Sequence, residues 1–180
     1  MLELSILGFL AEEALHGYEL KERITALSGL SGHVRPVSDG ALYPAINRLL
    51  AAGLLDQRSG QGPSAAPRRV LVLTEEGRAE LLRRLRGPRQ AEITDPVRFH
   101  TVLAFLRHLD DPAEQAAVLR RRLDFLAAPA GSSRRAGGPG RAPEAGDLFR
   151  EGLLRVARAA GDAEREWLRE AIATLSRARS

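Results

Sequence analysis

The segment from residue 37 to residue 50 constrains the fold of this chain more than any other. Its large apolar residues recur at helical spacing and form one stripe that must be buried, made of Leu42, Ile46, Leu49 and Leu50. The opposite side carries small, hydrogen-bonding or cationic residues, among them Gly40, Asn47 and Arg48. A short helix with such an outer face can enter the major groove of DNA. The pattern is common on surface helices, so its meaning depends on the elements that flank it.

Two helices are expected before this segment. Apolar residues surround the first, over residues 2–12, so we expect it to be buried on more than one side. The second is expected over residues 18–27, with Leu20, Ile24 and Leu27 facing inward. Ser38 occupies the position of an N-cap for the third helix, and Gly53 is expected to end that helix.

A β-hairpin is expected next. Residues 54–58 and 68–73 read as short strands joined by a turn-rich loop, and Thr74 begins a fourth helix with two acids in its first turn. Helix, helix, helix, hairpin, helix is the order of a winged helix-turn-helix. We therefore predict a mainly α-helical fold with a small β-hairpin, in which residues 1–86 are a DNA-binding domain.

Residues 87–180 are predicted to form an α-helical dimerisation domain that also holds any effector site. Asp95-Pro96 and Asp111-Pro112 each place an N-cap residue before proline, which indicates a helix start. Residues 129–146 are rich in Gly, Pro, Ala and Arg and lack large apolar side chains, so we expect a flexible linker. A last helical stretch is expected over residues 147–178.

The charge distribution indicates a polyanionic partner. The chain has a net charge of +4, and residues 34–73 contain five arginines against two aspartates, which gives +3 for this segment alone. The excess therefore lies on and around the third helix and the hairpin, where contact with DNA is expected.

Other functional classes find little support. The chain has no cysteine, which excludes disulfides and thiolate metal sites and fits a cytoplasmic protein. No run approaches about 18 apolar residues, so neither a membrane span nor a signal peptide is expected. His100 and His108 are too far apart along one helix to chelate one ion, and neither a metal nor a cofactor is expected. No phosphate loop or nucleophile elbow indicates an enzyme.

Four ordered motifs resemble the PadR family of bacterial transcriptional regulators over about the first 86 residues. They are Leu15-His16-Gly17-Tyr18-Glu19-Leu20, Gly40-Ala41-Leu42-Tyr43-Pro44-Ala45-Ile46, Leu49 through Gly53-Leu54, and Arg68-Arg69 through Leu73-Thr74-Glu75-Glu76-Gly77-Arg78. The helical remainder resembles the virulence-activator-type C-terminal domain of the larger PadR subfamily, through a helix pair and a last helix with Trp167-Leu168.

This resemblance implies a homodimeric repressor that binds a palindromic operator in double-stranded DNA and is released by a small-molecule effector. The C-terminal helices, helped by the first helix, would join the two protomers. The residues expected at this dimer interface are Leu4, Leu7, Phe149, Leu153, Val156, Trp167, Leu168, Ile172 and Leu175. Trp167 has a second interpretation, as a ring that stacks on an aromatic effector. Neither the effector nor its site can be identified from the sequence.

The residues expected to contact DNA come from the second helix, the loop after it, the third helix and the hairpin. They are Tyr18, Lys21, Arg35, Ser38, Gly40, Tyr43, Asn47, Arg48, Arg58, Arg68 and Arg69. The resemblance implies phosphate contacts for both tyrosines, although half-buried core positions are the alternative. Asn47 would read adenine or bind a phosphate. Leu71 stands where the family usually has a wing tyrosine, so one backbone contact is expected to be missing.

A winged helix can also serve as a protein-interaction module without DNA binding. That alternative requires an apolar outer face on the third helix, whereas this face is polar and cationic. Solvated arginines are the alternative to phosphate contacts for Arg48, Arg58, Arg68 and Arg69.

Overall fold

The computed structural model describes residues 1–30, 37–60, 68–128 and 147–177. It divides into two compact units, residues 1–110 and residues 111–180, called here the N-terminal and C-terminal units. The predicted linker at residues 129–146 lies outside the described residues. No helix among the described residues is long and apolar enough to cross a membrane.

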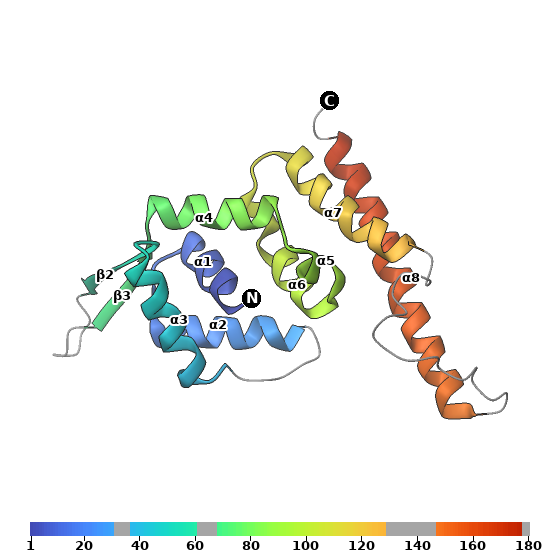
Figure 1. The fold of residues 1–180 in the computed structure, drawn as a ribbon, viewed down its shortest axis with the longest axis horizontal. Coiled ribbons are helices and arrows are strands. Elements are labelled where there is room, and N and C mark those ends of the chain that lie inside the picture. The colour runs from blue at the N-terminus through green and yellow to red at the C-terminus, as the bar shows by residue number, and fades with distance from the viewer. Residues whose placement is uncertain (31–36, 61–67, 129–146, 178–180) are drawn as a thin grey trace. The chain divides into compact units, whose positions relative to one another are not determined.

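The N-terminal unit has the predicted winged helix-turn-helix order (Figure 1). Its elements are α1 (Leu2–Glu12), β1 (Leu15–His16), α2 (Gly17–Leu30), α3 (Asp39–Ala51), β2 (Leu55–Gly60), β3 (Arg68–Leu73), α4 (Glu75–Arg86), α5 (Gln90–Thr94), α6 (Pro96–Phe105) and the 3-10 turn η1 (Leu106–His108). The mainly helical fold with a small sheet is confirmed.

The sheet is antiparallel, with the strand order β1, β3, β2. Arg58 pairs with Val70 in the hairpin, and Leu15 pairs with Leu71 on the other edge. The strand β1 was not predicted, because two residues are too few to show an alternating pattern. It attaches the start of α2 to the hairpin, since Leu15 is buried beside the hairpin strand β3.

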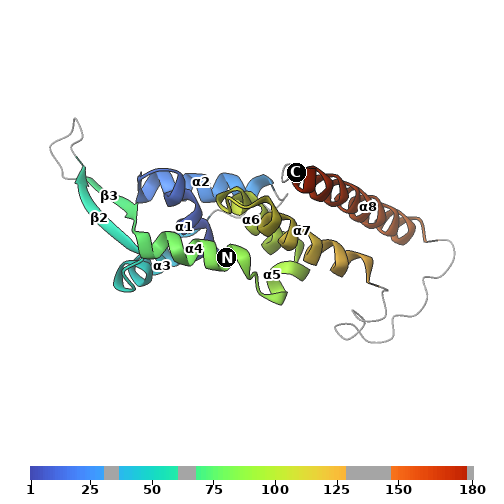
Figure 2. The ribbon, with the colours of Figure 1, turned by 90° about the horizontal axis from the view of Figure 1, so that it is seen from above.

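Helix α1 is the centre of this unit. It lies between α2 and α4 in both ribbon views (Figures 1 and 2), and it also packs against α3, α6 and β3. Its residues from Leu4 to Gly8 are all buried. The expected burial on more than one side is therefore confirmed, and the surrounding elements belong to the same unit.

Helix caps follow the sequence closely. The Thr74 hydroxyl accepts a hydrogen bond from Gly77 N–H at 3.0 Å and donates one to Gly53 C=O at 2.8 Å, which joins the end of α3 to the start of α4. Gly53 has φ +70° and ends α3, where a side chain would be strained. Asp95 caps α6 as predicted, by accepting a hydrogen bond from Arg98 N–H at 3.0 Å.

The expected division at residue 86 differs from the packing. Compact packing continues to Asp110, because α6 packs against α1 through Phe105, whose ring meets Phe9 edge to face with centroids 5.0 Å apart. Gly8 makes this approach possible, since a Cβ there would collide with the Phe105 ring. The five-residue α5 was not predicted, because so short a helix shows no period.

The C-terminal unit consists of α7 (Pro112–Ala127) and α8 (Leu148–Arg177), which pack together. Asp111 caps α7 by accepting from Ala113 N–H at 2.8 Å, as its Asp-Pro signal predicted. Helix α8 continues through Gly161 without a break.

Gly8→Ala tests the contact between α1 and α6. The added methyl group would collide with the Phe105 ring, so we expect the free energy of unfolding to fall by about 1–3 kcal/mol in urea titrations. Gly29→Ala in α2 is the matched control, because no atom lies within 4 Å of its added Cβ. An equal effect of both substitutions would contradict the close packing at Gly8.

Candidate nucleic-acid interface

Helices α2 and α3 are joined in the manner of a helix-turn-helix. Lys21 Nζ lies 2.7 Å from Asp39 Oδ1, which links the first turn of α3 to α2. The Tyr43 ring lies beside Gly17, where a Cβ would be 3.4 Å from its Cε1. The absence of a side chain at Gly17 therefore lets the outer face of α3 approach the start of α2.

The predicted two faces of α3 are present. Leu42, Ile46 and Leu49 are buried, together with Ala45, whereas Leu50 is half-buried. The outer face exposes five predicted contact residues, Ser38, Gly40, Tyr43, Asn47 and Arg48. Tyr43 is 48% exposed, so it is no core residue.

Ser38 begins α3 by a different route from the predicted one. Its side chain makes no capping hydrogen bond. Its backbone carbonyl accepts from the N–H groups of Ala41 and Leu42, each at 3.0 Å. The acid needed at the positive end of the helix dipole is supplied by Asp39. The exposed Ser38 hydroxyl is therefore not used by the helix cap.

The hairpin presents arginines beside α3. Strands β2 and β3 project from the unit next to α3 (Figures 1 and 2). Arg58 and Arg69 are exposed there, and Arg69 Nη1 lies 3.5 Å from Gln57 Oε1. Among the described residues, neither arginine has a carboxylate partner. The Arg68 side chain and Arg35 lie outside what the structure describes.

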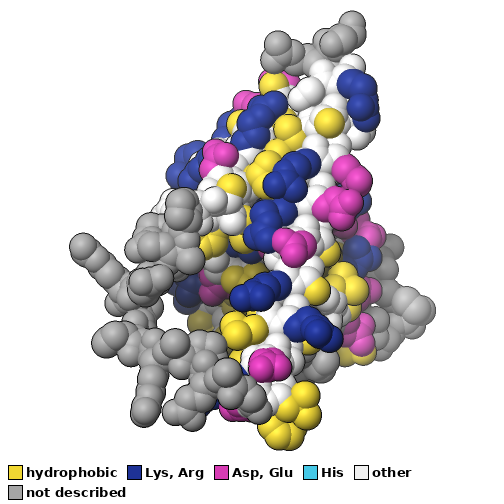
Figure 3. All heavy atoms as spheres, turned by 90° about the vertical axis from the view of Figure 1, so that its right-hand side faces the viewer, with side chains coloured by type: hydrophobic (Ala, Val, Ile, Leu, Met, Phe, Trp, Pro, Cys, Tyr) yellow, Lys and Arg dark blue, Asp and Glu magenta, His cyan; other side chains and the backbone are white. Residues whose placement is uncertain are grey.

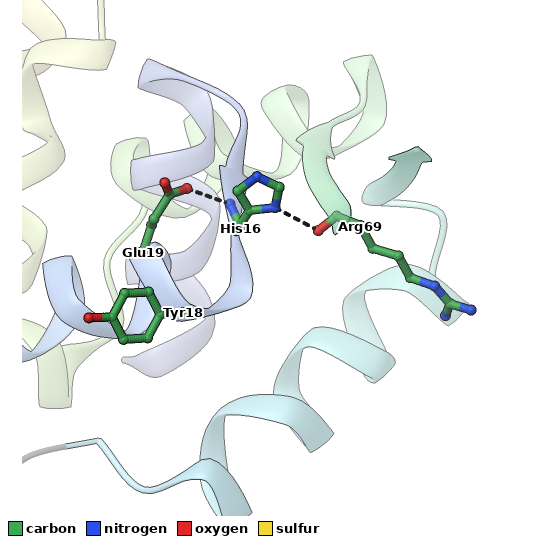
Figure 4. A pocket seen from close by; sticks show the side chains of 4 residues that line it. All are labelled: His16, Tyr18, Glu19 and Arg69. Carbon is green, nitrogen blue, oxygen red and sulfur yellow. Dashed lines mark hydrogen bonds between the residues drawn. The ribbon is translucent and has the colours of Figure 1, made fainter. Parts of the chain in front are cut away.

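A cavity of about 470 Å³ separates the start of α2 from the hairpin, lined by His16, Tyr18, Glu19 and Arg69 (Figure 4). His16 Nδ1 lies 3.2 Å from Arg69 C=O, so this nitrogen must donate, and Glu19 accepts from His16 N–H at 2.8 Å. His16 therefore holds the start of α2 on the hairpin. The Arg69 guanidinium extends away from the imidazole (Figure 4).

Three other predicted contact residues already have acidic partners. Tyr18 donates to Glu22 one turn along α2, and this hydrogen bond raises the pKa of the Tyr18 hydroxyl. Lys21 pairs with Asp39, as described above. Arg48 Nη2 lies 3.1 Å from Glu3 Oε1 in α1. A phosphate would have to displace a carboxylate at each of these positions, but not at Arg58 or Arg69.

The Glu3 carboxylate begins a chain of ion pairs between helices. Its Oε2 lies 3.4 Å from Arg84 Nη1, and Arg84 Nε lies 2.7 Å from Glu80 Oε1. Arg83 also donates to Glu80, through two hydrogen bonds of 2.7 Å. Arg48, Glu3, Arg84, Glu80 and Arg83 thus connect α3, α1 and α4.

Sequence reasoning missed the carboxylates of this surface. Glu22 lies four residues after Tyr18 on the same helix, and this spacing signals their contact. Nothing local signals the pairing of Glu3 with Arg48, because the two residues are far apart in the sequence and meet only through packing. Among the described residues, no group of three or more His, Asp and Glu side chains is placed to hold a metal ion.

Residues 6–83 match the model of the transcriptional regulator PadR-like family. This range contains α2, α3 and both hairpin strands, together with most of α1 and α4. The likeness to the PadR-like family therefore covers residues 6–83. The name PadR-like domain is used below for residues 6–83.

Among solved structures, the chain is similar to Bacillus subtilis PadR in complex with operator DNA, with 20% identity, 97% of this chain and 98% of that chain covered, and a TM-score of 0.43. The chain is also similar to the same protein in complex with p-coumaric acid, with 20% identity, 97% of this chain and 98% of that chain covered, and a TM-score of 0.41. A third similar structure is smu.1604c from Streptococcus mutans, with 18% identity, 98% of this chain and 92% of that chain covered, and a TM-score of 0.42. No curated protein sequence matches the chain. The likeness to the family rests on residues 6–83.

Outside the PadR-like domain, α8 has two different faces. Leu168 is fully buried, and Arg122 of α7 makes two hydrogen bonds to Glu164, at 2.8 and 3.0 Å. The Arg122 side chain is 2% exposed and also lies over the Phe125 ring at 5.6 Å from its centroid. This face therefore packs on α7.

The outer face of α8 exposes apolar side chains among charged ones (Figure 3). Phe149, Leu153, Val156 and Trp167 are all exposed, Phe149 to 86%. With two exposed alanines, they follow one another in alternating steps of four and three residues, as Phe149, Leu153, Val156, Ala160, Ala163 and Trp167. This is the spacing of a coiled-coil seam.

The other predicted dimer residues do not share this face. Leu4 and Leu7 are buried inside the N-terminal unit, where the unit's own elements enclose α1, so their part in a dimer interface stays a prediction. Leu168 is buried where α8 packs on α7, and its part in the dimer also stays a prediction. Ile172 and Leu175 are half-buried.

Glu80→Gln tests the chain of ion pairs. Hydrogen bonds from Arg83 lower the pKa of Glu80 from 4.5 to about 2, against a smaller opposing effect of burial, and Arg84 adds to the lowering. Ionised Glu80 therefore stabilises the fold above about pH 4.5, and this contribution is lost as the pH falls toward 2. We expect the variant to be less stable by about 1 kcal/mol at pH 7, because the Arg83 side chain is largely exposed and water screens its pair with Glu80.

Urea titrations at pH 7 and pH 3 measure this difference. The difference in the free energy of unfolding between wild type and variant should be smaller at pH 3, because a larger fraction of Glu80 is protonated there. A gap that stays constant between the two pH values would contradict the assigned partners.

Proposed function

We propose that this PadR-like regulator binds double-stranded DNA through residues 1–86, with α3 in the major groove and the hairpin on the flanking phosphates. The observation that carries this proposal is the placement of Arg58 and Arg69, which lack carboxylate partners in the described structure, beside the exposed polar face of α3. Phosphate contacts of this kind supply most of the affinity, and base contacts supply sequence choice.

Each predicted residue takes a role according to its surroundings. Gly40 and Asn47 lie on the exposed side of α3, where an asparagine can bond adenine bidentately or bind a phosphate. Ser38 and Tyr43 flank them and would bind phosphates, as would Arg68 of the hairpin. Tyr18, Lys21 and Arg48 would exchange a carboxylate for a phosphate on binding.

We further propose that the regulator is a homodimer joined through the outer face of α8. Apolar side chains in a coiled-coil spacing are stabilised when a second helix covers them, and a second copy of the chain supplies an identical seam. Two α3 helices would then enter major grooves about one helical turn apart on a palindromic operator. Residues 87–180 would serve this dimerisation, with Ile172 and Leu175 contributing at the end of α8.

The family resemblance also implies repression in the bacterial cytoplasm and release by a small-molecule effector. We propose both for this chain. Trp167 could stack on an aromatic effector only if the dimer leaves it accessible. Catalytic activity is not part of the proposal, because the matched family consists of transcriptional regulators.

A protein-interaction module without DNA binding is the alternative function. It would need a large apolar surface on the outer side of α3. Tyr43 is the only large hydrophobic residue exposed on the described α3, which favours DNA.

Arg58→Ala/Arg69→Ala tests the role of the hairpin. We expect weaker binding to a random-sequence duplex and a smaller dependence on salt, with the slope of log K against log salt reduced by about 0.9 per lost phosphate contact. Fluorescence anisotropy over a salt series measures both. Arg98→Ala/Arg150→Ala removes the same charge from α6 and α8 and should leave the slope unchanged. Equal slopes for the double variant and wild type would refute the hairpin contacts.

Leu153→Glu/Val156→Glu tests the dimer. Both side chains are about two-thirds exposed in the protomer, so the change should spare its fold and place charges in the seam. We expect a monomer in sedimentation velocity, with unchanged helical content. Arg155→Gln/Arg158→Gln makes the same change in charge at exposed positions off the seam and should remain dimeric. A dimeric Glu variant would show that another surface joins the protomers.

A further inference from the structure

A second basic site lies at the edge of the proposed DNA-binding surface. A cavity of about 340 Å³ opens between α1, α3, α4 and the start of α5. The charged side chains that line it are Glu3, Arg48, Arg83, Arg84, Arg89 and Glu92. It is called the arginine cleft below. Only Arg48 belongs to the residues assigned above to DNA contact.

The two carboxylates in this cleft are already in use. Glu92 Oε2 accepts from the backbone N–H of Arg89 at 2.7 Å and thereby caps α5. Glu3 is shared between Arg48 and Arg84, at 3.1 and 3.4 Å. Among the described residues, the Arg89 guanidinium has no carboxylate partner. Glu80, outside the cleft lining, also holds Arg83 and Arg84. The four guanidinium groups of the cleft therefore outnumber the three carboxylates near them, and Arg89 supplies the excess positive charge.

The geometry around Glu3 shows what kind of group fits. One carboxylate bridges guanidinium groups from two helices, so an anion at this point is held from both sides. A phosphate has more oxygens and more charge than a carboxylate, and arginine forks match phosphate oxygens well. It could engage Arg48 and Arg84 in place of Glu3, and the exposed Arg89 as well.

We propose that the arginine cleft binds a phosphate group, and that Glu3 occupies part of this site until the phosphate arrives. The phosphate comes from the DNA backbone beyond the end of α3 or from a free phosphorylated molecule. Only the first source rests on the function proposed above. In both cases Arg48 couples the cleft to α3. A phosphate that replaces Glu3 as the partner of Arg48 changes the charge beside the outer face of α3.

Two substitutions in the full-length protein test the cleft. Arg89→Gln removes the guanidinium that has no carboxylate partner in the described structure, and Glu3→Gln removes the competing charge while keeping the side chain's shape. Arg98→Gln is the control for Arg89→Gln, because Arg98 lies outside the cleft lining and pairs within its own turn with Asp95 at 3.7 Å. Helical content and thermal unfolding of all variants are recorded first.

The first measurement is calorimetric titration of inorganic pyrophosphate into DNA-free protein. The second is anisotropy of a random-sequence duplex over a salt series. In at least one of them we expect Arg89→Gln to weaken binding about tenfold, as for the loss of one charged hydrogen bond, and Glu3→Gln to strengthen it. Arg98→Gln should match wild type.

The two measurements separate the two sources of phosphate. Duplex binding that changes in the cleft variants, with a salt slope lower by about 0.9 in Arg89→Gln, identifies the DNA backbone. Pyrophosphate binding that changes alone identifies a free ligand. If Arg89→Gln and Glu3→Gln both behave like Arg98→Gln in both measurements, the inference is overturned. Wild-type protein that binds pyrophosphate through Arg89 but binds no duplex refutes the proposed function and leaves the cleft standing.

Discussion

The enclosure of α1 is the interaction on which the rest of the N-terminal unit depends. Its apolar side chains contact α2, α3, α4, α6 and β3, so burial of one helix fixes the positions of all these elements. Gly8 lets Phe105 approach closely and thereby extends the packing to α6. The same enclosure explains why α1 has no large apolar surface left for a partner.

Electrostatics divides the proposed DNA-binding surface into two parts. Arg58 and Arg69 on the hairpin are available at once, whereas Tyr18, Lys21 and Arg48 hold carboxylates. Exchanging a carboxylate for a phosphate contributes less binding free energy than forming a new phosphate contact, because one ion pair is lost for each one formed. The hairpin is therefore expected to dominate affinity, and the outer face of α3 to supply sequence choice. Figure 4 shows the two parts meeting, with His16 holding the hairpin against the start of α2.

The C-terminal unit separates its two tasks onto two faces of one helix. The face toward α7 combines the buried Leu168 with the Arg122–Glu164 pair, in which the carboxylate compensates the charge of a guanidinium that is almost fully buried. The other face leaves Phe149, Leu153, Val156 and Trp167 exposed in a seam. Sequence periodicity could not separate these sets, because apolar residues lie on both faces of α8.

The sequence by itself determined the order of elements, the caps at Gly53, Thr74 and Asp95, and the inner and outer faces of α3. These features depend on local spacing and on the chemistry of single residues, which the chain order displays directly. Only the tertiary structure decided which residues contact each other across long stretches of the sequence. The strand β1, the packing of α6 on α1, and the contact of Glu3 with Arg48 all join residues that are distant in sequence. Such contacts arise from packing, so no local pattern records them.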